Sequence, residues 1–361
     1  MQLRQLWLTD FRSYPSVELE FAPGLTALLG ANGQGKTNVM EAVGYLATLS
    51  SFRGAPNDAL VRDGAAMAIV RAEGEREGRN LLIEAEIAIT GRGRVQVNKQ
   101  RLTRSRDLLG ALRVSVFAPD DLELVKGGPA ERRRYLDDTL VSRRPAFDAL
   151  RTDLERVLKQ RNALLRQAGG RLTPEIEMTL AVWDSKLVEA GEALASARYE
   201  LVLELAPALD QAYNQVAGSP ASIEITYDAP WRAIGLAEAL LEARRDEIRR
   251  GISLVGPHRD DLRITLNGLP ARTHASQGEQ RSVSLALRLS AHRVVTEATG
   301  SAPILLLDDV FSELDPDRSA ALLEHLPPGQ TILSSAAGLP PGAAPELILR
   351  VEHGTVHRDE V

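Results

Sequence analysis

Eight consecutive residues near the N-terminus have the types and the order needed to hold a polyphosphate. They follow the pattern G-x-x-x-x-G-K-[ST] and are Gly30, Ala31, Asn32, Gly33, Gln34, Gly35, Lys36 and Thr37. The glycines let backbone N–H groups curl around phosphates, the lysine reaches the β- and γ-phosphates, and the threonine hydroxyl ligates Mg²⁺. An apolar run precedes this P-loop and a helical pattern follows it, so an anion-attracting helix N-terminus faces the phosphates. This context predicts ATP and Mg²⁺ as cofactors; an ordinary glycine-rich turn is the alternative.

A second acidic motif lies far along the chain. Four apolar residues, 304–307, predict a buried strand, and Asp308 and Asp309 end it. The first carboxylate is the candidate Mg²⁺ residue, and the second is the candidate base that polarises the attacking water. Any buried strand can end in aspartate, so the interpretation depends on the P-loop. We expect Lys36 and Asp309 to be catalytic, with Thr37 and Asp308 at the metal.

A third motif, Ala275-Ser276-Gln277-Gly278-Glu279-Gln280, precedes an amphipathic run. A serine at an open, glycine-flanked helix N-terminus can bind an anion. The alternative is a capping box, because Glu279 stands three residues after Ser276.

The elements that must position these motifs form an α/β pattern. Short strands are expected over much of residues 3–117 and again from 252 onward, whereas residues 129–251 are mostly helical in pattern. Two long helices, joined near Gly169-Gly170, carry apolar seams too short for a long coiled coil. We expect an ATPase head formed by residues 1–125 and 252–361, with flanking helices on a mixed sheet, and a helical insertion at 126–251.

Composition narrows the class of protein. The 361 residues carry a net charge of −6 and include no cysteine, which excludes disulfides and cysteine-ligated metal centres. No apolar run is long enough to span a membrane, and the first residues lack a signal-peptide core. A soluble cytoplasmic protein without a membrane partner is expected.

The three motifs together resemble the ABC-type ATPases, including the SMC proteins, in which a signature segment precedes the acidic strand. The resemblance implies that two subunits enclose ATP, with Ser276 and Gly278 acting in trans and the segment around Asp315 at the interface. The 240 residues from Lys36 to Ser276 exceed the gap of a transport ATPase and are far fewer than in an SMC protein.

Further strings make the resemblance more specific. They are LTDFRSY at 8–14, FAPDDL at 117–122, KGGP at 126–129, RRRYLD at 132–137 and GPHRDDL at 256–262. With the motifs above, they are similar to the RecF family of bacterial recombination mediators over Leu3 to about Ser335. That family implies ATP-dependent homodimers, DNA binding, slow hydrolysis, and help in loading RecA at gaps with RecR and RecO.

The sequence departs from the wider ABC pattern at three places. Asp309 stands where transporters carry glutamate, which is consistent with slow turnover. Ser334-Ser335 stands where they carry histidine, so the sensor of the γ-phosphate is expected to be a hydroxyl. Gln277 replaces a usual glycine of the signature.

Basic clusters are the candidate DNA contacts, because arginine and lysine neutralise backbone phosphates without reading sequence. The candidates are Arg92, Arg94, Lys99, Arg101, Arg132, Arg133 and Arg134. Aromatic residues do not interleave with them, which favours duplex backbone contact over base stacking. A solvated basic face is the alternative.

Other segments have weaker functional interpretations. Arg12, His258 and Arg259 are candidates for ATP contact, and Asp120 and Asp121 for a linker that senses nucleotide.

We therefore expect an ATP-gated DNA clamp that acts as a recombination mediator and is reset by weak ATPase activity. The alternatives are an ABC-type ATPase coupled to transport or to chromosome tethering, and a P-loop kinase. A kinase need not dimerise with nucleotide.

Overall fold

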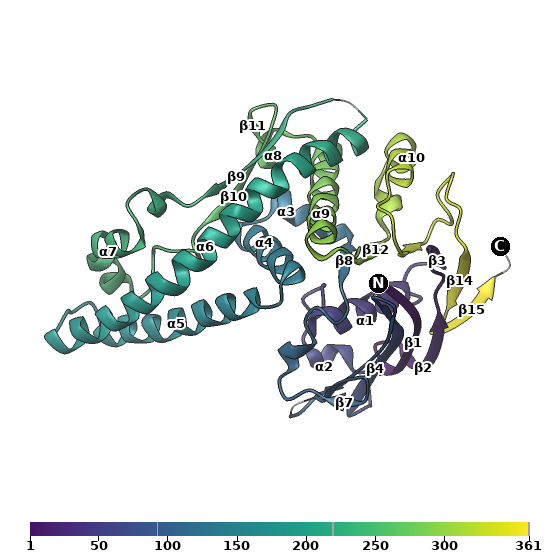
Figure 1. The fold of residues 1–361 in the computed structure, drawn as a ribbon, viewed down its shortest axis with the longest axis horizontal. Helices are drawn as coiled ribbons and strands as arrows, with labels where there is room; N and C mark the ends of the chain where they lie inside the picture. The colour runs from purple at the N-terminus through teal and green to yellow at the C-terminus, as the bar shows by residue number, and fades with distance from the viewer. Residues whose placement is uncertain (92, 219, 360–361) are drawn as a thin grey trace. The chain divides into compact units, whose positions relative to one another are not determined.

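The computed structural model describes residues 1–91, 93–218 and 220–359 (Figure 1). It divides into two compact units. The first unit comprises Met1–Leu122, Ala208–Ala221 and Ser276–Val361, and the second comprises Glu123–Pro207 and Ser222–Ala275.

The first unit contains two six-stranded sheets. One is antiparallel, in the order β2-β1-β4-β5-β6-β7, with β1 (Gln2–Phe11), β2 (Tyr14–Glu20), β4 (Met67–Arg76), β5 (Arg79–Ala88), β6 (Val95–Val97) and β7 (Gln100–Arg101). The other is parallel except for its edge strand β15, in the order β15-β14-β3-β13-β12-β8, with β3 (Leu25–Leu29), β8 (Val114–Phe117), β12 (Ile304–Asp308), β13 (Thr331–Ser335), β14 (Leu347–Glu352) and β15 (Thr355–Asp359).

The helices of this unit are α1 (Lys36–Thr48), α2 (Asn57–Leu60), α9 (Gln277–Thr299) and α10 (Pro316–Glu324), with 3-10 turns η1 (Ser105–Leu108), η2 (Pro119–Leu122) and η4 (Val310–Glu313). Burial alternates along β4 and β5, as expected when one face of an antiparallel sheet is buried, whereas all of β12 and β13 is buried. One core cluster joins α1 to both sheets through residues such as Met40, Leu8 and Leu306. The core therefore anchors the helix that follows the P-loop.

The second unit is mostly helical. Its elements are α3 (Glu123–Lys126), α4 (Pro129–Arg143), α5 (Phe147–Ala168), most of α6 (Pro174–Val216), η3 (Pro230–Ala233), α7 (Leu236–Arg250), α8 (Ala271–His274) and a three-stranded sheet of β9 (Ile223–Asp228), β10 (Asp261–Leu266) and β11 (Leu269–Pro270). Along α6 the expected apolar seam is largely buried, at Leu187, Leu194 and Leu201. Within the described ranges, none of the helices combines the length and apolar character that a membrane crossing requires.

The boundaries correct two sequence expectations. Strand β9 lies inside the segment expected to be helical, and it pairs antiparallel with β10. Residues 252–275, expected in the head, belong to the second unit. Residues 208–221, expected in the insertion, belong to the first unit.

Candidate nucleotide-binding site

The P-loop follows the buried strand β3 and leads into α1. Gly35 has φ 115°, and a side chain there would approach the Tyr14 hydroxyl to 2.7 Å, so glycine is required for both reasons. The Tyr14 hydroxyl donates a hydrogen bond to the Gly35 carbonyl at 3.1 Å. The start of β2 therefore supports the C-terminal end of the loop.

Lys36 turns its ammonium group back into the loop. Its Nζ donates to the Gly30 carbonyl at 2.7 Å and to the Ala31 carbonyl at 2.9 Å. Burial lowers the pKa of this lysine, and Asp309 and Asp308 oppose that shift. The loop thus encloses a positively charged group, which would attract a negatively charged polyphosphate.

The structure brings the P-loop and the acidic strand together across 271 residues of sequence. Thr37 Oγ1 donates to Asp308 Oδ1 at 3.0 Å, and Ser334 Oγ, from the end of β13, donates to the same oxygen at 2.6 Å. Burial raises the pKa of Asp308, and the two hydroxyls oppose the rise. A buried carboxylate and a hydroxyl at this distance are oxygen ligands of the kind that Mg²⁺ prefers.

Asp309 has an unusual backbone and an unsatisfied side chain. Its φ is 50°, and its N–H donates to Ser334 Oγ at 3.0 Å. Its buried Oδ1 has no hydrogen-bond partner within the described part of the chain. A buried acceptor without a partner is costly. This orphaned oxygen, beside the Lys36 cradle and the Thr37–Asp308 pair, fits a site for ATP, Mg²⁺ and the attacking water.

Ser334, expected with Ser335 as the sensor of the γ-phosphate, contacts the two carboxylate residues in this structure. Its side chain is fully buried and bridges Asp308 to the backbone of Asp309. These contacts hold Asp308 and Asp309 together, a link that no sequence signal indicated.

The signature segment forms the capping box that was its alternative interpretation. Ser276 Oγ accepts from the Glu279 N–H, and Glu279 accepts from the Ser276 N–H at 2.7 Å. A side chain at Gly278 would come within 2.6 Å of the Arg318 guanidinium, so the glycine allows Arg318 to lie close to the start of α9. No sequence pattern indicated this contact. The cap shapes the N-terminus of the 23-residue helix α9 and leaves its anion-attracting dipole in place.

Three residues expected near ATP have protein partners. Arg12 forms a bidentate ion pair with the buried Glu41 of α1, at 2.7 Å for both contacts. His258 and Arg259 lie in the second unit, where both contact the Ser253 carbonyl. These contacts occupy the groups and do not favour a role at the phosphates.

The segment at Asp121 does contact the signature helix. Asp121 Oδ1 accepts from Arg288 Nε of α9 at 3.0 Å, and its Oδ2 accepts from the Ala118 N–H. This ion pair, within the first unit, is consistent with the expected linker at Asp120 and Asp121.

The basic candidates separate into exposed and occupied residues. Arg94, Lys99, Arg101 and Arg134 are exposed, although Arg94 and Arg134 lie within 4 Å of Glu86 and Asp138 respectively. In contrast, Arg132 is buried against Asp261, and Arg133 donates to the Asp260 carbonyl. Burial also lowers the pKa of Arg133. We therefore correct the expectation for Arg132 and Arg133, which are structural; Arg92 lies outside the described residues.

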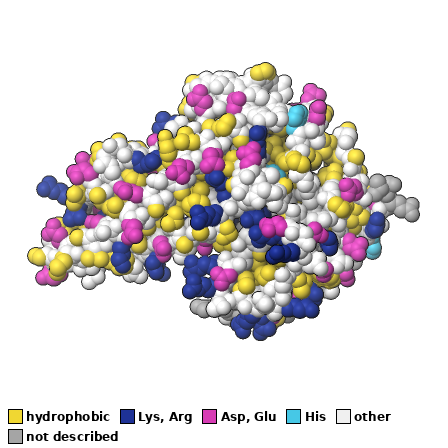
Figure 2. All heavy atoms as spheres, viewed as in Figure 1, with side chains coloured by type: hydrophobic (Ala, Val, Ile, Leu, Met, Phe, Trp, Pro, Cys, Tyr) yellow, Lys and Arg dark blue, Asp and Glu magenta, His cyan; other side chains and the backbone are white. Residues whose placement is uncertain are grey.

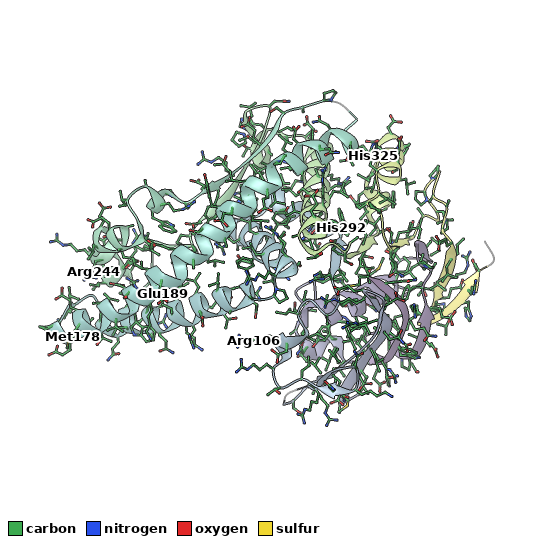
Figure 3. All side chains as sticks on the ribbon, viewed as in Figure 1. Arg106, Met178, Glu189, Arg244, His292 and His325 are labelled. Carbon is green, nitrogen blue, oxygen red and sulfur yellow. The ribbon has the colours of Figure 1, made fainter. Side chains whose placement is uncertain are left out.

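The exposed basic residues around β7 have an aromatic neighbour that the sequence pattern missed. Figure 2 shows Lys and Arg side chains gathered at the end of the first unit that carries β7, and Arg106, labelled in Figure 3, projects from the same region. The guanidinium of Arg71 lies 5.0 Å from the ring centroid of Trp7. Cross-strand pairing then continues from Arg71 through Glu84 and Gln96 to Arg101, so the sheet, not the sequence, brings Trp7 into this row.

Comparison with known proteins agrees with this geometry. The family model described as RecF/RecN/SMC N terminal domain matches residues 2–332. The chain is 45% identical to the DNA replication and repair protein RecF of Streptomyces avermitilis, over 99% of this chain and 100% of the relative. It is 46% identical to RecF of Frankia alni over 93% of each chain.

Solved structures give the same result. A structure of the recombination mediator protein RecF with ATP, in the RecFOR pathway, superposes with a TM-score of 0.91 at 27% identity and covers 99% of this chain and 98% of its own. The Smc head domain of Pyrococcus furiosus shares the fold, with a TM-score of 0.61 at 18% identity over 100% of this chain and 96% of its own.

The two sheets, the P-loop and the acidic strand define an ABC-type ATPase head of the RecF/RecN/SMC class. Within this class, the identity of 45–46% to RecF proteins, which extends over almost the full length of the chain, decides the assignment. The chain belongs to the RecF family.

Proposed function

We propose that this protein is an ATP-gated DNA clamp that acts as a recombination mediator in DNA replication and repair. The observation that carries the proposal is the convergence of Lys36, Thr37, Asp308 and the orphaned Asp309 carboxylate at one site. The RecF relatives, described as DNA replication and repair proteins, support the biological setting.

Each residue at the site would have a separate chemical role. The backbone of Gly30–Thr37 and the Lys36 ammonium would bind the phosphates, and Thr37 with Asp308 would hold the metal. When bound, Mg²⁺ neutralises charge on the phosphates of ATP. Asp309 would take the proton of the attacking water on its free Oδ1, while Ser334 fixes both carboxylates. Aspartate has a shorter reach than glutamate, which supports weak ATPase activity suited to a switch.

Homodimer formation would complete the site. The N-terminus of α9, with Ser276 and Gly278, would meet the phosphates held by a second copy of the chain. Its helix dipole favours an anion there. ATP would thus close the dimer, and hydrolysis would release it.

DNA is the proposed cargo of the closed dimer. The exposed residues Arg94, Lys99, Arg101 and Arg134 would contact backbone phosphates. RecR and RecO are the proposed partners, consistent with the RecFOR pathway of the structural relative, and RecA loading at gaps is the proposed outcome. We place this activity in the cytoplasm.

The test measures DNA affinity by fluorescence anisotropy and mass by light scattering, with ATP, ADP or no nucleotide. In the wild type, ATP should raise both quantities. Lys36→Met and Ser276→Arg should lose the gain, whereas Lys186→Met and Ser196→Arg, exposed on α6, control for each change of residue type. The clamp proposal would be refuted if nucleotide did not change the DNA affinity and Ser276→Arg behaved like the wild type.

A further inference from the structure

The P-loop contacts the turn of the last hairpin in the chain, between β14 and β15. Gln34 Oε1 accepts a hydrogen bond from the His353 backbone N–H at 2.6 Å, across 319 residues of sequence. His353 has φ 48°, a conformation that side-chain-bearing residues rarely adopt. The turn is therefore shaped so that this N–H points at the loop.

A second contact joins the same hairpin to the start of the loop. A side chain at Gly30 would come within 2.2 Å of the Val351 carbonyl, so the backbones of β14 and the P-loop lie directly against each other. Strand β14 pairs in parallel with β3 up to Arg350 and Leu29, immediately before this approach. Residues 351–353 thus contact both Gly30, where the loop begins, and Gln34, four residues on.

The hairpin turn is itself held by the turn that supports the other end of the loop. A side chain at Gly354 would approach the Ser13 carbonyl to 3.0 Å, and the adjacent Tyr14 donates to Gly35. Asn38 of α1 also donates to Ser13 Oγ at 3.0 Å. Two turns therefore enclose the P-loop, one near each terminus of the chain.

We propose that the His353–Gly354 turn is a positioning element for the P-loop, with Gln34 as the residue through which it acts. The turn holds the loop open in the shape that accepts phosphates, and nucleotide occupancy in turn stabilises the hairpin. The inference rests on the proposed nucleotide site. The hairpin lies beyond residue 332, where the match to the family model ends.

The physical argument is preorganisation. A glycine-rich loop has many conformations, and ordering it on binding reduces affinity unless contacts within the protein order it beforehand. Because coupling between two sites is reciprocal, a ligand that tightens the loop must also tighten the turn that holds it. Removing the Gln34 acceptor weakens this coupling without altering any backbone donor for phosphate.

The experiment compares the wild type with Gln34→Leu in the full-length protein. Affinity for a fluorescent ADP analogue should fall about two- to fivefold. This loss is at the lower end of the net contribution of one hydrogen bond, because this bond is exposed to solvent. Hydrogen exchange of residues 347–359 should slow on adding saturating ADP in the wild type and should slow markedly less in the variant, which keeps the contact at Gly30. Asp359→Asn removes the exposed Arg350–Asp359 ion pair of the same hairpin and is the matched control; it should keep wild-type affinity.

A second variant perturbs the turn from its other side. Gly354→Ala, which displaces the turn from Ser13, should also weaken ADP binding, and melting curves would establish that each variant is folded. Hairpin exchange that ignores ADP in the wild type, or an unchanged response in Gln34→Leu, would overturn the inference while leaving the nucleotide site intact. A wild type that binds no ADP would overturn the proposed site and this inference with it.

Discussion

The most demanding prediction concerns Arg161, a fully buried cation in the second unit. Its guanidinium donates to Asp184 at 2.7 Å, to Ser253 at 2.8 Å and to Glu247 at 2.6 Å. The side chains of Arg161 and Glu247 are both 0% exposed. These contacts join α5, α6 and α7 through one charge.

The replacement Arg161→Leu would leave the two carboxylates in different states. Asp184 keeps Arg244, labelled in Figure 3, at 2.6 Å. Among the described residues, Glu247 keeps the Leu254 N–H at 2.7 Å and becomes a buried charge without its cation. Breaking such a pair from one side costs about 3–5 kcal/mol. The double variant Arg161→Leu/Glu247→Leu removes both charges and should recover most of that loss.

Urea unfolding followed by tryptophan fluorescence would measure both variants. Trp183 and Trp231 lie in the second unit, so a Trp7→Phe background restricts the signal to it. Arg156→Leu removes an exposed arginine of the same helix and should change the unfolding free energy by less than about 0.5 kcal/mol. A cost below about 1 kcal/mol for Arg161→Leu, or a double variant no more stable than the single one, would refute the reasoning.

Three further predictions concern the first unit. Ser334→Ala should lower kcat about tenfold or more and weaken Mg²⁺ dependence, because Asp308 and Asp309 lose their shared support; unchanged Mg²⁺ titrations of ATPase activity would contradict this. Burial raises the pKa of Asp308, so the folded state binds a proton more tightly than the unfolded state does. The folded state therefore loses stability as the pH rises through the pKa of Asp308 in the folded protein. In EDTA, Asp308→Asn should therefore melt above the wild type at pH 7, with the difference shrinking as the pH falls, and a variant that melts lower at pH 7 would exclude the argument. Replacing Arg94 and Arg101 by glutamine should lessen the slope of log DNA affinity against log salt by about 2 for each subunit that contacts DNA, and an unaltered slope in anisotropy titrations would move the DNA contact elsewhere.

Sequence alone predicted the P-loop, the buried strand before Asp308 and the helix capped at Ser276, because each depends on local patterns. Residue spacing and hydrophobic runs encode these features directly. The pairing of Thr37 with Asp308 was also predictable, since both motifs end parallel strands whose carboxyl ends share one edge of a sheet.

Contacts that depend on tertiary packing were not predictable. Arg132 and Arg133 belong to a basic run, yet Asp261 of β10 supplies the acidic partner of Arg132, and Asp260, just before that strand, supplies the carbonyl that binds Arg133. Trp7 lies far from the basic residues in sequence and reaches them only through strand pairing. Strand β9 was missed because it is a single short strand between helical segments, and its partner β10 follows a 15-residue helix.

The position of β3 has a consequence for how the protein is made. This strand carries the P-loop and is synthesised among the first thirty residues, but its two neighbours in the sheet are β13 and β14. At about 5–20 residues per second, the ribosome needs roughly 15–60 seconds to supply them. Until then the phosphate loop is present as a sequence with no sheet to hold it. Nucleotide binding is thus a property of the finished chain, and a product truncated before residue 331 carries the complete motif without a working site.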